Sequence, residues 1–396
     1  MASFGVVMLL AVSGCSKSAP ASQQGGGGGQ SEATATVRLP GLVYWNDRNP
    51  AGPWSVHIVK MDRNQNDLTL RSTLARNTVL GLDTLTAQLR TIPASFGKPV
   101  AAINGDFYVV DDNPYRGDPR GIQILEGELL SSPGDQVAFW MDPDSKPHTG
   151  LVESKMKVTL PDGTALRFRI NEERGQKEVV LYTPRLGTST RTAGGKEFVL
   201  AREGSSPWLP LSPGANYSVK ITEIRTEGDT SLKGDRMVLS AGPKVTATSP
   251  LAVGDILKIN TTVEPDMTGV RTAIGGGNVM VHEGKVADIQ IPSSGAYKYR
   301  SVVERHPRSA IGFNKTHLFL VQVDGRQPAL SVGMTLKELG KYMHGLGCEE
   351  AINFDGGGSA TIYVNGDVVN SPCYGSERDI GNALVIVRRA TSGATK

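Results

Sequence analysis

The sequence lacks the features of three common classes of protein. Its net charge is only +3 and it contains no run rich in Lys and Arg, so a nucleic-acid-binding stripe is not expected. Its six histidines include no His-x-His or HExxH spacing, which argues against a transition-metal site. No P-loop lysine accompanies the glycines at residues 356–358, so a nucleotide-phosphate cradle is not expected either.

The sequence also lacks a long hydrophobic run. Residues 4–12 are apolar, but a membrane-spanning helix needs roughly 20 apolar residues. A run of this length is typical of the h-region of a signal peptide. It ends in Val-Ser-Gly-Cys at residues 12–15, which resembles a bacterial lipobox. We therefore expect a lipoprotein signal peptide over residues 1–15 and lipidation at Cys15. The alternative is an ordinary cleaved signal with an incidental cysteine.

The residues after Cys15 predict a tether. Residues 16–36 include five consecutive glycines and too few apolar side chains to bury a core, so they are expected to be flexible. By resemblance to bacterial lipoproteins, Ser16 in place of an aspartate fits an outer-membrane destination in a cell with two membranes. We therefore expect a lipid-anchored protein of the cell envelope, on the periplasmic side, or an extracellular one.

Strand-like segments dominate the rest of the chain. They are short, apolar or β-branched, and bounded by turn residues, and glycine is abundant. The predicted strands lie at residues 56–59, 100–103, 179–182, 256–259, 317–323, 351–354, 361–364 and 383–387. Helices are predicted only at residues 82–90 and 335–345. In the second of these, Thr335 and Glu338 have the spacing of a capping box.

This pattern predicts an α+β fold with a strand-rich, mixed-sheet catalytic core and few helices. Residues 37–150 and 271–396 are expected to form the core. Residues 151–270 differ in composition, because prolines and charged turns separate their short strands. We interpret them as a β-rich insertion within the same domain.

Polar residues follow one predicted strand directly. The strand at residues 100–103 runs into Asn104, Gly105 and Asp106. Polar groups at a strand end, presented by a glycine, often form a binding edge. Asn-Gly is also a strong turn signal, so a simple turn is the alternative.

Arg308 and Asp324 adjoin two further apolar segments. Arg308 precedes an apolar stretch, and a fixed guanidinium suits phosphate or carboxylate because its donors match two oxygens at once. Asp324 ends the strand at residues 317–323 and is followed by Gly325. The alternatives are a surface arginine in a loop and a hairpin turn.

Asp355 begins the glycine-rich segment. It follows the buried strand at residues 351–354 and precedes Gly356, Gly357, Gly358 and Ser359. Small residues here let a ligand approach the backbone, whose N–H groups can bind an anion. The following segment has the pattern of a strand and not of a helix, which again disfavours a nucleotide cradle.

A dense polar patch precedes the last predicted strand. It contains Glu377, Arg378 and Asn382, and a solvated loop is its alternative interpretation. The same arrangement, an apolar strand beside an acid, amide or arginine with glycine nearby, recurs along the chain. This repetition predicts one composite site built from several strand ends.

In these motifs the sequence resembles the phosphodiester glycosidase family. The main matching stretches are residues 103–108, 306–312, 323–326, 335–339, 353–361, 377–378 and 382–384. Residues 182–184, 189–192, 275–277 and 281–285 also fit bacterial relatives. Order and spacing agree across residues 56–388. The family more often has glycine at the position of Asp106 and threonine at that of Ser309.

The resemblance implies hydrolysis of a sugar-1-phosphodiester, of the α-GlcNAc-1-phosphate type, at the bond from the anomeric carbon to oxygen. Such reactions usually employ two carboxyl groups, and we hypothesise that Asp324 and Asp355 form the pair. Which acid plays which part stays open. A phosphate leaving group needs less acid help, so electrostatic stabilisation matters more; Arg308, Arg378 and the loop amides are expected to supply it.

The remaining site residues are expected to bind substrate. Asn104 and Asn382 are expected to hold sugar hydroxyls. The other predicted substrate-binding residues are Asp106, Gly356, Gly357, Gly358, Ser359 and Glu377.

Two other functions remain open from the sequence. One is hydrolysis of ordinary glycosidic bonds in cell-wall or exopolysaccharide, and the other is a polysaccharide-binding lipoprotein without catalysis.

The partners expected are a sugar phosphodiester or polysaccharide and, through the lipid, a membrane. No cofactor is required, although Mg²⁺ or Ca²⁺ held by Asp oxygens is an alternative. Cys348 and Cys373 flank the glycine-rich segment and form either a disulfide around it or two buried free thiols.

Overall fold

The computed structural model describes residues 32–50, 52–134, 136–291 and 296–390. The predicted signal peptide, Cys15 and residues 16–31 of the predicted tether lie outside these ranges. Residues 32–36, which we had assigned to the tether, instead begin strand β1 (Glu32–Leu39). No helix within the described ranges is long and apolar enough to cross a membrane.

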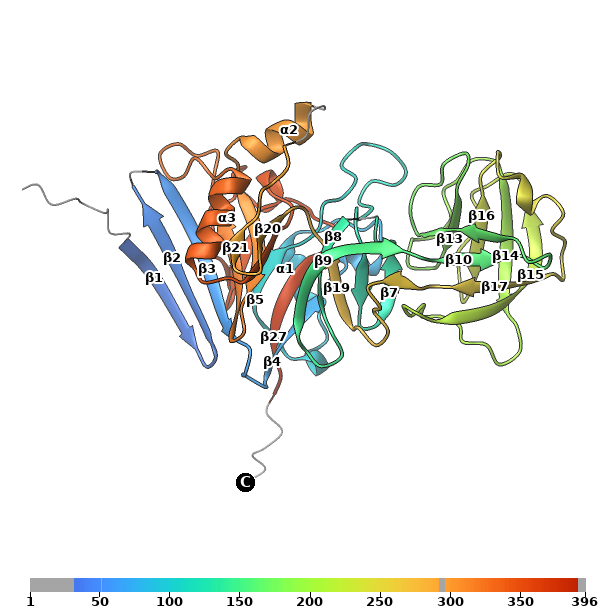
Figure 1. Cartoon of the computed structure of the whole chain (residues 1–396), viewed down its shortest axis with the longest axis horizontal. Coiled ribbons are helices and arrows are strands. Elements are labelled where there is room, and N and C mark those ends of the chain that lie inside the picture. The colour runs from blue at the N-terminus through green and yellow to red at the C-terminus, as the bar shows by residue number, and fades with distance from the viewer. Residues whose placement is uncertain (1–31, 51, 135, 292–295, 391–396) are drawn as a thin grey trace, which may run out of the picture. The chain divides into compact units, whose positions relative to one another are not determined.

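An eight-stranded antiparallel sheet joins strands that are far apart in the chain (Figure 1). Its middle strands β3 and β23 pair so that Val56 lies opposite Val323. In spatial order its strands are β1, β2 (Leu42–Asn49), β3 (Trp54–Asp62), β23 (His317–Val323), β22 (Arg308–Phe313), β24 (Glu350–Asn353), β20 (Val279–His282) and β21 (Lys285–Val286).

A five-stranded antiparallel sheet packs face to face against it. In spatial order its strands are β26 (Asp367–Val368), β25 (Ile362–Val364), β5 (Lys98–Asn104), β27 (Ala383–Arg388) and β4 (Leu68–Ser72). Val59 and Leu320 from the first sheet share one buried core with Ile103 and Leu384 from the second. Successive side chains of a strand point to opposite faces, so each strand can supply two cores.

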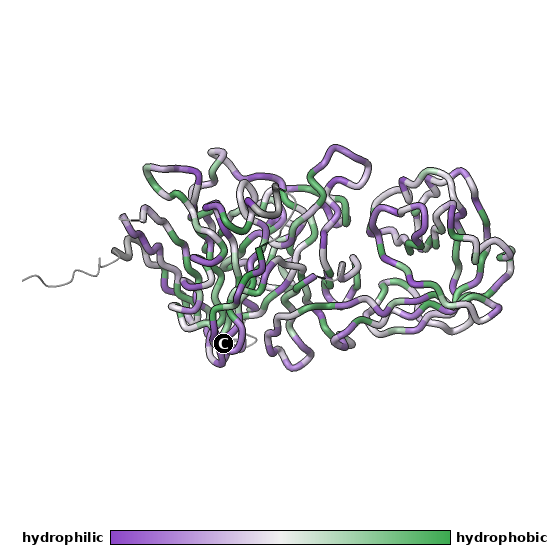
Figure 2. The backbone as a smooth tube through the Cα atoms, turned by 45° about the horizontal axis from the view of Figure 1, so that its top comes forward, coloured by the Kyte–Doolittle hydropathy of each residue, from purple (hydrophilic) through white to green (hydrophobic). Residues whose placement is uncertain are grey.

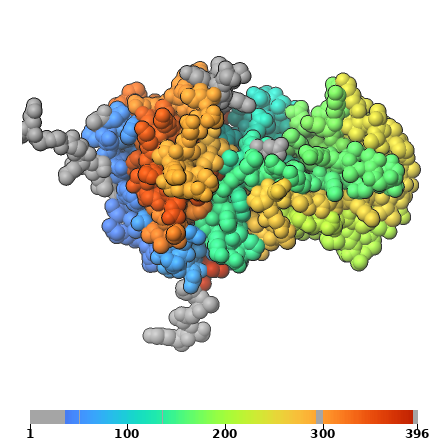
Figure 3. Space-filling view, in the orientation of Figure 1, coloured from blue at the N-terminus to red at the C-terminus, as the bar shows by residue number. Residues whose placement is uncertain are grey.

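Helices cover the outer faces of the two sheets. Leu339 and Met343 of α3 (Leu336–Gly345) pack in one cluster with Ile58 and Val321, the outward-facing residues of the first sheet. α3 is visible at the surface in Figure 3. On the second sheet, Leu85 of α1 (Leu85–Arg90) packs with outward residues of β5 and β27. The order of layers is therefore helix, sheet, sheet, helix.

Two more sheets make up the rest. The six-stranded sheet contains β18 (Val263–Glu264), β9 (Pro147–Ser154), β8 (Gln136–Met141), β19 (Thr272–Gly275), β6 (Gln123–Leu125) and β7 (Glu128–Ser131). The second eight-stranded sheet contains β11 (Ala165–Arg167), β10 (Lys157–Thr159), β17 (Ile256–Asn260), β15 (Asn216–Arg225), β14 (Lys196–Arg202), β16 (Met237–Ala241), β13 (Val179–Tyr182) and β12 (Arg169–Ile170). These two sheets share a large buried core, to which Ile124 and Leu239 belong.

The predicted fold class is confirmed. Strands dominate, helices are few, and β12 with β13 supplies a parallel pair in otherwise antiparallel sheets. Figure 2 shows the pattern behind this: hydrophobic stretches run along the strands and hydrophilic ones collect at many of the turns. The remaining elements are α2 (Ala296–Val303) and the 3-10 helices η1 (Ala75–Asn77), η2 (Ala94–Phe96), η3 (Thr246–Thr248) and η4 (Gly357–Ser359).

Candidate active site

Several strand ends meet at one end of the two-sheet sandwich. Asn104 at the end of β5 pairs with Ala383 at the start of β27. Arg308 at the start of β22 pairs with Val323 at the end of β23, and β24 ends beside them at Asn353. The pairing therefore brings the predicted motifs together in space, although they are spread over most of the chain.

Asn104 links the two sheets behind the site. It is buried, and its Nδ2 donates to the main-chain oxygen of Asp355 at 2.7 Å. Its Oδ1 accepts from the Ser309 hydroxyl at 2.6 Å and from the Thr361 amide at 3.1 Å. Its side-chain polar atoms are thus bonded to protein, and it fixes the start of the glycine loop where we had expected a sugar contact.

Asp106 and Asn382 are engaged in the same way. The Asn382 side chain accepts from the Asp106 amide at 2.9 Å and donates to Gln123 at 3.0 Å. The two carboxylate oxygens of Asp106 accept from the amides of Phe107 and Gly121, both at 2.7 Å. Both side chains are buried, so they support the loops and do not line an open surface.

The glycines are required by close neighbours. A Cβ on Gly356 would lie 2.6 Å from the carbonyl oxygen of Pro307, and one on Gly358 would lie 2.3 Å from a ring carbon of Tyr374. Gly357 has φ of 59°, in the left-handed region that side chains disfavour. The loop therefore folds tightly over the end of β22.

The loop amides have partners within the protein. The Gly356 amide donates to the Asp355 carboxylate at 2.9 Å, and the Gly357 amide donates to the Pro307 carbonyl at 2.9 Å. Ser359 donates through its amide to the Gly356 carbonyl at 3.1 Å. These three donors hold the loop itself, so the expected anion contact does not come from them.

Asp355 is the acid of the site. Burial raises its pKa to about 6, and the Ser359 hydroxyl, the Gly356 amide and the charges of Arg378 and Arg326 oppose that rise. A carboxyl group held close to neutral pH by opposing influences is typical of catalytic sites.

Asp106 is electrostatically coupled to Asp355. Burial raises the pKa of Asp106 to about 7, and the negative charge of Asp355 adds to the rise. The negative charge of Asp355 therefore favours the protonated form of Asp106.

Arg326 lies over the glycine loop. A Cβ on Gly357 would be 3.1 Å from one of its terminal nitrogens. Its guanidinium donates to the Tyr374 hydroxyl at 3.2 Å and lies 3.4 Å from Nδ1 of His306. Arg326 is exposed, so a ligand at the loop can reach it.

Arg378 approaches the loop from the other segment. Its guanidinium carbon lies 5.7 Å from the ring centroid of Tyr108, and its Cδ would be 3.4 Å from a Cβ on Gly358. Tyr374, beside it, is 67% exposed, which is unusual for a large aromatic side chain. Asp355, two arginines and two tyrosines thus gather around one glycine loop.

Sequence reasoning missed four of these residues. Arg326 and Tyr108 stood inside motifs that we had singled out, but neither was assigned a role. His306 and Tyr374 lie within or beside matching stretches. The available signal was their place next to strand ends; nothing local showed that they gather near the glycine loop.

Asp324 lies in a buried network. It is 1% exposed, and one oxygen is 3.0 Å from Nε2 of His57. The other accepts from the Ser371 amide at 3.0 Å and from Gln322 at 3.3 Å. His57 in turn contacts the Tyr44 hydroxyl at 2.9 Å. The geometry gives Asp324 a supporting place, whereas we had expected it to form the catalytic pair with Asp355.

Arg308 also points into the protein. It is buried, and its guanidinium donates to the carbonyls of Met334 at 2.7 Å and Glu304 at 2.8 Å. Ala310, on the same face of β22, packs in the core beneath α3. Arg308 therefore lies toward the helix side of the sheet, and Arg326 is the arginine that reaches the glycine loop.

Glu377 is bonded to helix α1. Its carboxylate accepts from the amide of Thr86 at 3.0 Å and from the hydroxyl of the same residue at 2.6 Å. Arg378, the next residue, is left to face the loop.

Of the two alternatives left open for the cysteines, the structure has the free thiols and not the disulfide. Cys348 and Cys373 are both free thiols. Cys348 is buried in the core beneath α3, on the helix side of the first sheet. Cys373 lies on the loop side, with its sulfur 3.7 Å from the carbonyl of Gly357. The sheet separates the two environments, so the spacing along the chain was misleading.

Within the described residues, no three His, Cys, Asp or Glu side chains come together with metal-binding geometry. Asp106 and Asp355 are held by backbone amides, which occupy oxygens that a hard cation would need.

Fold and site together define a strand-rich α+β protein whose strand-end loops place one acid between two arginines. Residues 215–387 match the model of the phosphodiester glycosidase family. This part of the chain is therefore similar to a phosphodiester glycosidase domain.

Three known proteins are similar to this chain in sequence or in structure. The N-acetylglucosamine-1-phosphodiester alpha-N-acetylglucosaminidase of Bos taurus is 31% identical over 107 residues, 27% of this chain and 20% of that protein. The matched stretch thus spans a fifth of the bovine protein. A hypothetical protein of Synechocystis has a TM-score of 0.70, 20% identity, and coverage of 89% and 63% of the two chains. A protein of Burkholderia pseudomallei K96243 has a TM-score of 0.66, 18% identity, and coverage of 85% and 74%. The two structures support the fold alone.

Proposed function

We propose that the protein hydrolyses a sugar-1-phosphodiester between the anomeric carbon and its oxygen. The observation that carries this proposal is the position of Asp355 at the glycine loop, under the influence of both Arg326 and Arg378. In a substrate of this class a single oxygen joins the anomeric carbon to the phosphate. The carboxylate of Asp355 suits the anomeric carbon, and the two guanidinium groups suit the phosphate.

Arg326 and Arg378 bind the phosphate. Guanidinium donors match two phosphate oxygens at once, and both arginines reach the loop from different segments. Negative charge develops on the phosphate oxygen as the bond breaks, and fixed positive groups stabilise that charge. This part of our original hypothesis moves from Arg308 to Arg326 and is unchanged for Arg378.

Asp355 acts as a carboxylate toward the anomeric carbon. It stabilises the positive charge that develops on the sugar as the bond to the phosphate oxygen breaks. The electron pair leaves with the phosphate. Water then supplies hydroxide to the anomeric carbon, and its remaining proton is released, so the products are a free sugar and a phosphomonoester. Asp106 lies in the loop next to that of Asp355, and the two loops are joined by the hydrogen bond that the Asp355 amide donates to the Gly105 carbonyl at 3.0 Å.

The sugar binds against the aromatic side chain of Tyr374. This residue presents an exposed ring beside Arg326, whereas Tyr108 is buried beneath Arg378. Aromatic rings offer an apolar face with a polar edge, which suits a sugar ring. The bovine relative is named for an N-acetylglucosamine-1-phosphodiester, which supports an α-GlcNAc-1-phosphate type of substrate.

We further propose an envelope or extracellular location with a lipid anchor at Cys15. The support is the lipobox-like end of the apolar run at residues 4–12. Metabolic labelling with a radioactive fatty acid, compared between the native chain and Cys15→Ala, tests the anchor.

The experiment for the activity compares Asp355→Asn with Asp367→Asn. Asp367 is an exposed residue at the start of β26 and undergoes the same acid-to-amide change. On a methyl diester of α-GlcNAc-1-phosphate we expect native activity from Asp367→Asn and a loss of at least about 1,000-fold in kcat from Asp355→Asn. Equal activity of the two variants would overturn the assignment. A neutral aryl α-GlcNAc hydrolysed faster than the diester would favour an ordinary glycosidase.

A further inference from the structure

A polar cavity lies at the opposite end of the strands from Asp355. It has a volume of about 690 Å³, within the range typical of small-molecule sites. Leu318, near the start of β23, and Arg389, just after the end of β27, line it. The candidate active site adjoins the other end of both strands, near Asp324 and Asn382. The two sites are therefore separated by the length of the sandwich.

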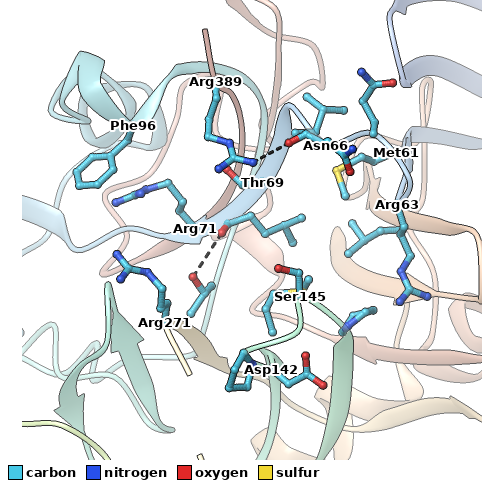
Figure 4. A pocket seen from close by; sticks show the side chains of 18 of the residues that line it. Met61, Arg63, Asn66, Thr69, Arg71, Phe96, Asp142, Ser145, Arg271 and Arg389 are labelled. Atoms are coloured by element: carbon cyan, nitrogen blue, oxygen red, sulfur yellow. Dashed lines mark hydrogen bonds between the residues drawn. The ribbon is translucent and has the colours of Figure 1, made fainter. Parts of the chain in front are cut away.

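Four arginines line this cavity, which we call the arginine pocket. They are Arg63, Arg71, Arg271 and Arg389 (Figure 4). They come from the β3–β4 connection, from β4, from the residue before β19 and from the segment after β27, and no local sequence pattern indicates that they meet.

Two of the arginines are held together by one acid. Glu126 accepts from Arg71 at 2.6 Å and from Arg271. The guanidinium of Arg71 stacks on the ring of Phe96, 3.4 Å from its centroid. Two cations therefore share a single carboxylate, and one side of Arg71 is fixed by an aromatic face.

The other two arginines are held by carbonyl oxygens. Arg63 donates to the main chain of Asn314, and Arg389 donates to that of Asn66 at 2.6 Å. Among the residues that the structure describes, neither arginine forms an ion pair with a carboxylate, and a guanidinium carries five N–H donors. Burial also lowers the pKa of Arg63, the expected effect of a partly desolvated cation.

The acids of the pocket do not balance these charges. Asp142 accepts from the Lys146 amide at 2.8 Å and from His148 at 2.8 Å. Glu126 is already bonded to two arginines. Four cations against two engaged acids leave the pocket positive. Gln65, Asn66, Thr69 and Ser145 add neutral hydrogen-bonding groups to the lining.

We propose that the arginine pocket binds the phosphate group of a phosphorylated saccharide. Guanidinium groups fit phosphate oxygens, and the amide and hydroxyl side chains fit sugar hydroxyls. The cavity is much larger than a phosphate ion, so the ligand includes more than phosphate. The proposal is independent of the reaction at Asp355, because it rests on other residues at the other end of the strands.

The test is made in a variant that lacks the active-site arginines, Arg326→Met with Arg378→Met. Calorimetric titration uses α-glucose 1-phosphate, glucose and inorganic phosphate as probes. We expect binding of the sugar phosphate, at least about tenfold weaker inorganic phosphate binding, and none of glucose. Adding Arg63→Gln and Arg271→Gln should weaken sugar phosphate binding at least about tenfold, because charge-assisted hydrogen bonds are lost.

Two further variants keep the result interpretable. Arg225→Gln removes an exposed arginine from β15 and should leave binding unchanged. Asn66→Asp places a carboxylate at an exposed lining position and should weaken binding without disturbing the fold. Binding that is indifferent to both Asn66→Asp and the arginine changes would overturn the proposal. Inorganic phosphate bound as tightly as the sugar phosphate would overturn the saccharide part. Hydrolysis of a diester by Arg63→Gln with Arg271→Gln in the native background reports separately on the Asp355 site.

Discussion

At the scale of single residues, the environment of Asp355 decides what chemistry is available. Burial raises its pKa to about 6, while Arg378 and Arg326 hold the carboxylate form accessible near neutral pH. A phosphate leaving group requires little protonation, so the useful form of Asp355 is the charged one. Arg326 and Arg378 therefore both stabilise the charged form of Asp355 and, in our proposal, bind the phosphate of the substrate.

This assignment predicts the pH dependence of the reaction. Asp355 should be needed as a carboxylate, so kcat/KM should fall as the pH drops below about 6, where the group becomes protonated. Initial rates on the methyl diester between pH 4.5 and 8.5 provide the measurement. A rate that instead falls above pH 6 would show that Asp355 works as a proton donor.

The same acid has a predictable effect on stability. Its raised pKa means that the folded state binds its proton more tightly than the unfolded state, so this contribution is present below about pH 4 and is lost as the pH rises through about 6. Asp355→Asn should therefore raise Tm more at pH 8 than at pH 5. Calorimetric melting at both pH values checks this; an equal change would contradict the raised pKa.

Arg326 should matter to catalysis and little to folding. It is exposed, so Arg326→Met should leave Tm close to native and lower kcat/KM for the diester by about 100-fold through loss of phosphate contacts. Arg326→Lys should restore part of the loss. Arg225→Met is the matched control, and an Arg326→Met enzyme as active as that control would contradict phosphate binding by this residue.

Several residues were found from the sequence, but their roles were not. Asn104, Asp106 and Asn382 stand at strand ends as predicted, yet their polar atoms bond to protein. Sequence gives the chemical type of a side chain next to a strand; it does not give the direction of that side chain. Direction depends on which strands become neighbours.

At the scale of elements, the local sequence pattern was sufficient to predict the bounds of several helices and strands. The helix at Leu336–Gly345 begins after Thr335, and the predicted capping box with Glu338 is present. The strands at His317–Val323 and Val179–Tyr182 have the predicted bounds. α1 begins at Leu85, later than predicted, because Thr84 caps it.

Local sequence patterns could not predict which strands pair when the strands are far apart in the chain. β3 lies beside β23, and β5 beside both β25 and β27. Such partners are selected by the cores that they bury, which a single sequence does not display. The absent disulfide has the same origin, since Cys348 and Cys373 occupy opposite sides of a sheet that local patterns do not reveal.

The network around Asp324 should act on stability. Asp324→Ala would leave His57 and the Ser371 amide without their buried partner, so we expect a loss of about 3 kcal/mol in the free energy of unfolding. Chemical denaturation measures the loss, and active-site titration of the folded fraction measures catalysis. A fully stable but inactive variant would return Asp324 to the catalytic pair.

At the scale of the whole molecule, the described residues present two positively charged sites at opposite ends of one strand sandwich. One contains an acid near the arginines and is suited to chemistry. In the other, the acids are already bonded to protein groups, so it is suited to binding. An enzyme that acts on phosphorylated glycans could use one site for hydrolysis and the other for binding. Substitutions in each site test the two functions separately.

The central claim concerns which bond is broken, and the isotope content of the products tests it most directly. Hydrolysis of the methyl diester in ¹⁸O-labelled water, followed by mass spectrometry, locates the incoming oxygen. Cleavage between the anomeric carbon and oxygen predicts that the label appears in the free sugar and is absent from the methyl phosphate. Label in the phosphate product would show attack at phosphorus and would contradict a glycosidase mechanism at Asp355.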